Sequence, residues 1–303
     1  MKKSETVFIA QESMNQGKQI VSLLEKFGLF WNVNKINLIA DGEPTQFYGT
    51  QREDTKNVFA CVKNGYQVLQ NWELAEIITE VAGNFDMGVA SGGSLNHGAK
   101  VYLQVHTGDL KGIGENHDTV KKYITAMNSH DGSASVGFGM TNVTISCSNT
   151  FHSAYKGVSK VRHTMSMMQK IEVLTDEFAS VKMEEQTLYD TFFKFADAPA
   201  DEKSILDVIM AATSVDASML PSHASNVYSK YQIGKTKQLS TRIAEEMTVK
   251  GQTLWGLFSG VTKYTNRDIS TPNRDNATQE SKLIGGANKL DNKVFKMLES
   301  IVA

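Results

Sequence analysis

The hydrophobic periodicity of this chain changes near residue 150, and this change constrains the fold more than any other feature. Before it, β-prone runs at residues 36–40, 58–62 and 99–106 alternate with turns, and their connections are too short for repeated βαβ crossovers. After it, nearly every segment has helical spacing. We therefore expect an α+β fold, with a mixed, mainly antiparallel sheet and helices in the N-terminal half, followed by a helical C-terminal half.

Local patterns give the other expected elements and the domains. Apolar residues spaced by threes and fours predict helices at residues 16–27, 71–82, 168–195, 202–212, 227–250 and 288–302. Further strands are expected at residues 122–127 and 141–147, and loops at residues 86–98 and 265–280. We expect a mixed sheet and helix domain at residues 1–160 and a mainly helical region at residues 161–303 packed on it.

Composition excludes several classes of protein. The 303 residues are 41% hydrophobic and 21% charged, which is typical of a globular chain, and the net charge of −2 gives no global attraction to nucleic acid or to a membrane surface. No apolar run approaches the roughly 20 residues of a membrane span, and the N-terminus lacks the apolar core of a signal peptide. We expect a cytoplasmic protein with no membrane partner, in which Cys61 and Cys147 are buried and reduced.

Residues 128–150 read NSHDGSASVGFGMTNVTISCSNT and place small and polar residues between two apolar runs. His130 and Asp131 are candidates for a general acid and base, or for ligands of a divalent ion. The histidines of this region do not have the spacing of a known ligand set, so hydrogen-bonded or surface histidines are the alternative. The glycines form neither a dinucleotide-binding motif nor a P-loop, and we predict no metal and no cofactor.

Cys147 is a further catalytic candidate. It ends a β-prone run just before a segment expected to be helical, where a helix N-terminus would favour its thiolate and His130 or His163 could act as the base. The alternative is structural, because a small apolar residue can end the strand while Asn149 or Thr150 caps the helix.

Charge is segregated along the chain although it nearly cancels. Residues 132–171 contain no acidic side chain, whereas residues 225–275 carry basic residues interleaved with tyrosines and a tryptophan. Basic groups neutralise phosphates and rings stack on bases, so this pattern is typical of a single-stranded nucleic acid surface. The alternative is a set of solvated helix faces whose aromatic residues lie in the core. The apolar stripe at residues 168–195 fits a core helix or a helix that forms oligomers.

A series of short motifs runs in order through most of the chain: Asn128-Ser129-His130-Asp131-Gly132-Ser133, Ser135-Val136, Phe138-Gly139, Cys147 with Asn149-Thr150, Arg162-His163-Thr164, Leu254-Trp255-Gly256-Leu257-Phe258, Gly260-Val261-Thr262 and Tyr264-Thr265-Asn266. Together these motifs resemble a family of phage and plasmid-like proteins, the domain of unknown function 932. Members usually have arginine and valine in the strand before the cysteine; this chain has Thr144 and Ile145, so no role of that arginine is transferred.

The resemblance implies a protein of mobile genetic elements, encoded near genes of DNA replication and recombination. We therefore expect a single-stranded DNA-binding protein, with a role such as strand annealing, in the cytoplasm of a bacterial host. An enzyme acting on nucleotides or nucleic acid through His130 and Asp131, and an oligomeric assembly or host-interaction protein, are the alternatives. We expect a homo-oligomer, and binding more than turnover. The expected nucleic-acid-binding residues are Lys160, Arg162, Lys263 and Arg267 on phosphates, Trp255 or Tyr264 for stacking, and His163.

Overall fold

The computed structural model describes residues 17–83, 88–144, 149–153, 160–176, 178–219, 228–269 and 277–303. The chain forms two compact units that are interleaved along the sequence. The first unit comprises Met1–Thr107, Ile124–Gly139 and Tyr155–Phe178, and the second comprises Gly108–Tyr123, Met140–Ala154 and Ala179–Ala303. The boundary that we expect near residue 160 stays a prediction.

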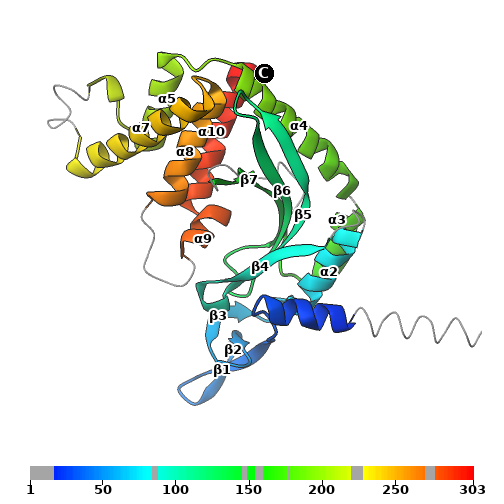
Figure 1. Ribbon diagram of the computed structural model, residues 1–303. Coiled ribbons are helices and arrows are strands. Elements are labelled where there is room, and N and C mark those ends of the chain that lie inside the picture. The colour runs from blue at the N-terminus through cyan, green and yellow to red at the C-terminus, as the bar shows by residue number, and fades with distance from the viewer. Residues whose placement is uncertain are drawn as a thin grey trace, which may run out of the picture. The chain divides into compact units, whose positions relative to one another are not determined.

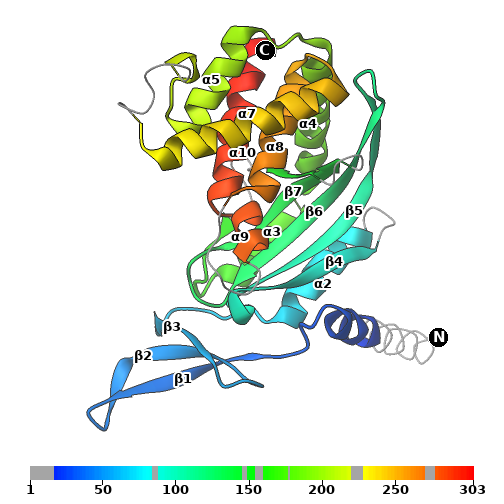
Figure 2. The same cartoon turned by 60° about the vertical axis from the view of Figure 1, so that its left-hand side comes forward.

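A three-stranded antiparallel sheet lies within the first unit (Figure 2). Its strands, in spatial order, are β1 (Val33–Ala40), β2 (Glu43–Arg52) and β3 (Val58–Lys63). Asp41 and Gly42 turn the chain between β1 and β2 with positive φ angles of 52° and 85°, a conformation that suits these two residue types. The strands at residues 36–40 and 58–62 are confirmed, whereas the sequence gives no signal for β2, because a proline near its start and polar residues along it resemble a loop.

The second sheet is also antiparallel and has the strand order β4-β5-β6-β7-β8, with β9 paired to β7. Parts of β5, β6 and β7 belong to each unit. The loop expected at residues 86–98 is wrong over β4, because Gly92 and Gly93 lie inside the strand. A Cβ on Gly92 would lie 2.5 Å from a methyl carbon of Leu103 on β5, so glycine is needed here for close packing and not for a turn. The strand bounds are β4 (Val89–Leu95), β5 (Lys100–Ile113), β6 (Asp118–Ser129), β7 (Val136–Thr144), β8 (Asn149–Ser153) and β9 (Lys160–Val161).

Helices dominate the C-terminal half of the chain (Figure 1). The predicted helix at residues 16–27 is confirmed over residues 17–26, and the one at 168–195 is helical at all of its described residues, which carry the labels α3 and α4. The loop expected at residues 265–280 begins and ends within helices. The bounds are α2 (Asn71–Gly83), η1 (Asn96–Gly98), α3 (Met167–Asp176), α4 (Phe178–Asp197), α5 (Glu202–Thr213), η2 (Ala217–Met219), α7 (Lys230–Lys250), α8 (Leu254–Arg267), α9 (Ala277–Leu283) and α10 (Gly286–Val302).

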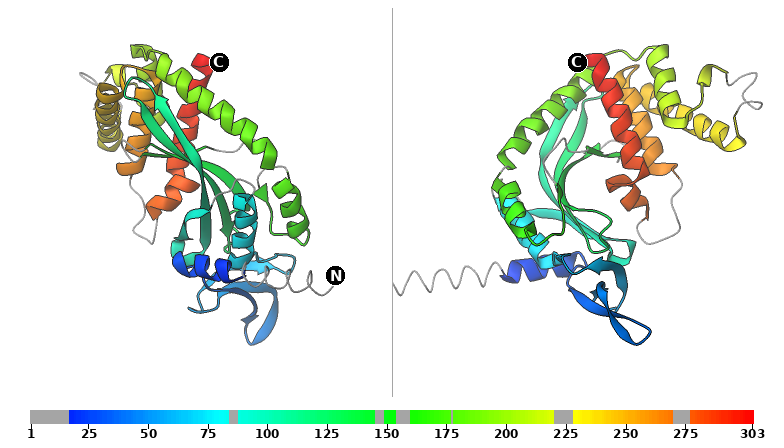
Figure 3. Two further views of the ribbon diagram at one scale, coloured as in Figure 1. Left: turned by 45° about the vertical axis from the view of Figure 1, so that its right-hand side comes forward. Right: turned by 180° about the vertical axis from the view of Figure 1, so that it is seen from behind.

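These elements confirm the α+β fold class, with strands in the N-terminal half and helices in the C-terminal half. In the second unit, α4 runs beside the tip of the β5–β6 hairpin, where Lys122 Nζ lies 4.7 Å from the ring centroid of Tyr189 (Figure 3). None of the helices in the described ranges is both long and apolar enough to cross a membrane.

Helices α7 and α8 of the second unit pack closely against each other, and two glycines allow this approach. A Cβ on Gly256 would lie 2.4 Å from the carbonyl oxygen of Gly251, and a Cβ on Gly260 would lie 2.4 Å from the Cα of Ile243. Both contacts are with backbone atoms, which cannot rotate away. The four-residue spacing puts both glycines on the face of α8 that packs against α7. Part of the Leu254-to-Thr262 motif is therefore explained by helix packing.

This close packing predicts opposite effects at two helical glycines. Gly260→Ala should destabilise the protein by ~1–3 kcal/mol, because the added methyl forces α7 and α8 apart. Gly234→Ala is the matched control: it lies in α7 with no atom near its missing Cβ, and it should stabilise the helix by ~0.5–1 kcal/mol. Urea denaturation followed by circular dichroism measures both changes, and equal effects of the two substitutions would contradict the packing argument.

Candidate functional site

The candidate catalytic residues His130 and Asp131 lie at the end of β6 and in the turn that follows it, in the first unit. Both oxygens of the Asp131 carboxylate have polar partners. Asp131 Oδ1 accepts hydrogen bonds from Ser129 Oγ at 2.9 Å, from the Ser133 backbone nitrogen at 2.9 Å and from Ser133 Oγ at 2.6 Å. Lys100 Nζ lies 3.3 Å from Oδ2. Burial opposes ionisation of Asp131, but the hydrogen bonds and the lysine charge outweigh it and hold the pKa below its usual value. Asp131 is thus an ionised residue that stabilises its own turn.

His130 is completely buried and is held in one tautomer. Its Nε2 lies 3.0 Å from Asn71 Oδ1. Asn71 Nδ2 donates to the carbonyl oxygens of Leu29 and Trp31, so Oδ1 must accept, and Nε2 of His130 carries the proton. The imidazole packs between the rings of Trp31 and Phe59, with ring centroids 5.5 and 6.0 Å away. Desolvation lowers the pKa of His130 to about 3, and His163 contributes in the same direction.

These contacts favour a structural role for His130 over general acid-base catalysis. A catalytic acid or base needs a pKa near the operating pH and access to the proton that it transfers. His130 stays neutral over the physiological range and has no exposed surface. Its hydrogen bond to Asn71 instead joins the turn after β6 to the start of α2.

Residues 66–71 connect the turn to a second motif. The Tyr66 hydroxyl donates to the carbonyl oxygen of Ser129 at 2.8 Å, and Asn128 Nδ2 donates to the carbonyl oxygen of Leu69 at 2.8 Å. His163 Nδ1 donates to the carbonyl oxygen of Gln67 at 2.9 Å, and its ring stacks on Tyr66 with centroids 4.7 Å apart. Two of the motifs that carry the family resemblance, around residues 130 and 163, therefore contact the same short segment, residues 66–71.

The remaining candidates are the two cysteines and a group of side chains that could hold a metal ion. Cys147 lies outside the described residues, so its predicted role as a nucleophile stays open. Cys61 is exposed on β3, which corrects the expectation that it is buried. In the described ranges no three histidine, cysteine, aspartate or glutamate side chains form a group that could hold a metal ion.

In the second unit, the two rings expected to stack on bases are buried. Trp255 is 3% exposed and Tyr264 is 2% exposed. Trp255 Nε1 donates to Asp118 Oδ2 at 2.9 Å, and Lys250 Nζ approaches the same oxygen at 2.7 Å. A base cannot reach either ring while α8 is packed in this way. Their position argues against the stacking role that the sequence suggests.

The basic candidates differ from one another in exposure. Lys263 is paired with Glu245 at 2.9 Å and with Glu246 at 3.0 Å, so its charge is already balanced. In the first unit, Lys160 and Arg162 are exposed while His163 is buried, and in the second unit Arg267 is exposed.

One helix of the second unit combines exposed basic and aromatic side chains, the combination that is typical of a single-stranded nucleic acid surface. Tyr231, near the start of α7, is 67% exposed, and Lys235 Nζ lies 4.9 Å from the centroid of its ring. Lys230 and Lys237 are also exposed on α7, but they lie roughly 100–120° around the helix axis from Tyr231 and therefore on a neighbouring face. Among the described residues none of these three lysines forms a salt bridge. We call Lys230, Tyr231, Lys235 and Lys237 the α7 basic surface, which wraps around the first two turns of the helix.

The spacing of Tyr231 and Lys235, four residues apart on a helix, is the signal that could have found this surface from sequence. By composition alone, Trp255, Phe258 and Tyr264 are as good candidates for stacking on bases as Tyr231. The burial of the first three distinguishes them, and that depends on how α8 packs.

These observations define an α+β protein. Its central motifs stabilise the fold, and its exposed basic residues form local surfaces. The chain belongs to the family described as a domain of unknown function (DUF932), which matches residues 58–284, more than half of its length. No curated protein and no solved structure matches the chain.

The burial of His130 predicts a particular dependence of stability on pH. Its pKa is about 3 in the folded protein against 6.5 for an ordinary histidine, so the unfolded chain takes up the proton first. The stabilisation is complete above about pH 6.5 and is lost as the pH falls toward 3, at up to ~1.4 kcal/mol per pH unit. In His130→Gln, which lacks the titrating group, the free energy of unfolding should fall less steeply between pH 6.5 and 4.

Urea denaturation at several pH values measures this slope. His117→Asn is the matched control, because His117 is exposed on a turn with a φ of 50°, which asparagine tolerates. The control should follow the wild-type pH dependence. Parallel curves for His130→Gln and the wild type would show that His130 is not buried and neutral.

Proposed function

We propose that this protein binds single-stranded DNA through the α7 basic surface. The exposed Tyr231 ring beside Lys235 is the observation that carries the proposal, since a base can stack on the ring while the ammonium groups neutralise flanking phosphates. The resemblance to phage and plasmid-like proteins supports DNA replication or recombination, including strand annealing, in the cytoplasm of a bacterial host as its setting.

The residues proposed here for base stacking and phosphate contacts differ from those expected from the sequence. Tyr231 replaces Trp255 and Tyr264 as the stacking residue, because those two rings are buried. Lys230, Lys235 and Lys237 replace Lys263, whose charge is balanced by two glutamates. In the first unit, Lys160 and Arg162 are exposed cations within a stretch that has no acidic residue, and they remain available for phosphate contacts.

An enzyme that uses His130 and Asp131 is less well supported. His130 has no exposed surface, and Asp131 is engaged by two serines and a lysine. Both residues contribute to a closed turn, and a reactive site would need them to contact a substrate. The third alternative is an oligomeric assembly or host-interaction protein. A protein that anneals DNA can also be a homo-oligomer, so the oligomeric state does not distinguish this alternative from the proposed function.

Fluorescence anisotropy with a labelled single-stranded oligonucleotide across a salt series tests the proposal. Tyr231→Ala should weaken binding by ~1–3 kcal/mol, the usual contribution of a stacked base, while Tyr231→Phe should bind nearly as well as the wild type. Lys235→Gln should reduce the slope of log affinity against log salt by about 0.7, the value for one phosphate contact on a single strand.

Lys296→Gln on α10 is the matched control for lost charge, because Lys296 is an exposed helical lysine outside the α7 basic surface. It should leave the salt slope unchanged. Absence of binding at low salt, or equal losses in Tyr231→Ala and Lys296→Gln, would reject this surface as a DNA-binding site.

A further inference from the structure

The first unit contains a small aromatic cavity with acidic side chains at its edge. The cavity has a volume of about 310 Å³. Its lining combines residues before β1, the turn after β2 and the start of α2, and consists of Leu24, Phe30, Trp31, Asn32, Glu53, Asp54 and Trp72. All of these residues belong to the first unit, so the cavity does not depend on the second.

Two aromatic side chains of the cavity are unusually exposed. Phe30 is 60% exposed and Trp72 is 42% exposed, whereas Trp31 is 8% exposed and forms part of the core. Solvation of two large aromatic rings on one cavity is unfavourable, and neighbouring exposed rings of this kind mark a binding surface. The rings supply apolar faces on which a flat or cationic group can lie.

The acidic side chains at the edge of the cavity determine the charge of the ligand that the cavity favours. Glu53 Oε2 accepts a hydrogen bond from Asn32 Nδ2 at 3.0 Å, and its Oε1 has no partner among the described residues. Asp54 is paired with Arg52 at 2.7 Å, so this pair contributes no net charge. The carboxylate of Glu53 is therefore uncompensated. It attracts a cation and repels the phosphates of a nucleic acid.

The protein itself shows the chemistry that suits these groups. The guanidinium of Arg52 lies 4.2 Å from the Trp31 ring centroid and donates to both oxygens of Asp54, at 2.7 and 2.9 Å. A planar guanidinium can stack on an indole and bind a carboxylate at the same time, whereas an ammonium group cannot present this fork. Trp72 and Glu53 offer a second indole and a second carboxylate on the same cavity.

We propose that this cavity binds an arginine side chain of a basic segment in a partner polypeptide. The guanidinium lies against Trp72 and Phe30 and donates to Glu53. This site is independent of the α7 basic surface in residues and in the charge of its ligand, so the two proposals can fail separately.

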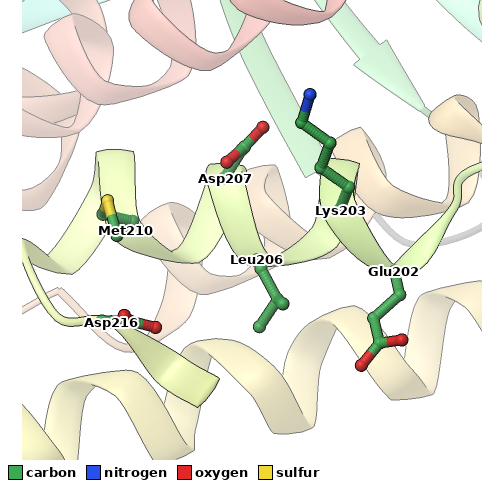
Figure 4. Close-up of a pocket in the computed structure, with 6 residues that line it drawn as sticks. All are labelled: Glu202, Lys203, Leu206, Asp207, Met210 and Asp216. Carbon is green, nitrogen blue, oxygen red and sulfur yellow. The ribbon is translucent and has the colours of Figure 1, made fainter. Parts of the chain in front are cut away.

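Another acidic cavity in the protein provides a control for charge alone. It lies on α5 in the second unit and is lined by Glu202, Lys203, Leu206, Asp207, Met210 and Asp216. Figure 4 shows Lys203 and Asp207 on one side of the helix and Glu202 and Leu206 on the other. It has acidic groups but no aromatic ring, so a ligand attracted only by negative charge should respond equally to Glu53→Gln and Glu202→Gln.

The experiment uses the full-length protein and three labelled dodecapeptides in which glycine alternates with arginine, lysine or glutamate. Fluorescence anisotropy should show the tightest binding for the arginine peptide and none for the glutamate peptide. Glu53→Gln and Trp72→Ala should each weaken binding of the arginine peptide about tenfold. Glu202→Gln should change it less than about twofold. Phe30→Ala serves as a second aromatic variant, since that ring is mostly exposed and its loss should not unfold the protein.

Four results would overturn the proposal. The first is absence of binding of the arginine peptide to the wild-type protein. The second is equal binding of the arginine and lysine peptides, and the third is an equal loss in Glu53→Gln and Glu202→Gln, which indicates attraction by charge alone. The fourth is retained peptide binding together with weakened binding of single-stranded oligonucleotide in Trp72→Ala and Phe30→Ala, which would assign the cavity to nucleic acid.

Discussion

The hydrogen bonds of the Asn71 side chain determine much of the first unit. This side chain is 1% exposed, and both of its polar atoms are used: Nδ2 donates to the carbonyl oxygens of Leu29 and Trp31, and Oδ1 accepts from His130. A buried amide that lost one of these partners would destabilise the fold by ~1–3 kcal/mol. One side chain thus joins α2, the segment before β1 and the turn after β6. The same contacts position Trp31 in the aromatic cavity.

A buried ion pair has a comparable role in the second unit. Asp118 at the start of β6 receives Lys250 from the end of α7 and Trp255 from the start of α8. Both charges are almost completely buried, and a buried charge that loses its partner is strongly unfavourable. The tryptophan of the Leu254-to-Phe258 motif is therefore explained by its hydrogen bond, and Gly256 and Gly260 by the approach of α7. These shared motifs identify a fold and do not identify a reaction.

The sequence predicts those features of the fold that depend on local pattern. The fold class, α2 and the alternating strand before residue 106 follow from periodicity and capping residues. Strand β4 could not be found in this way, since Gly92 looks like a turn residue until the Leu103 side chain is known to lie against it. Glycine permits both a turn and a close approach, and only tertiary structure distinguishes them.

The same limit applies to the candidate sites. Basic and aromatic residues in the region 225–275 predict a nucleic acid surface by composition, but composition does not show which rings are exposed. Tertiary packing buries Trp255 and Tyr264 and leaves Tyr231 in solvent. The aromatic cavity was missed for a related reason: Phe30, Glu53 and Trp72 are far apart in sequence, and no spacing rule connects them.

The net charge of −2 conceals local surfaces of opposite sign. The α7 basic surface offers three lysines to a polyanion, while Glu53 at the aromatic cavity repels phosphate and attracts a cation. If both surfaces bind ligands as proposed, each would discriminate by repulsion as well as by attraction, and two sites with aromatic rings could select ligands of opposite charge. The overall charge supplies no long-range attraction for DNA, so the proposed binding of DNA depends on contacts within about one Debye length, roughly 8 Å at physiological salt. In the proposed complex, stacking of a base on Tyr231 would be the part of the binding free energy that remains when added salt screens the lysines.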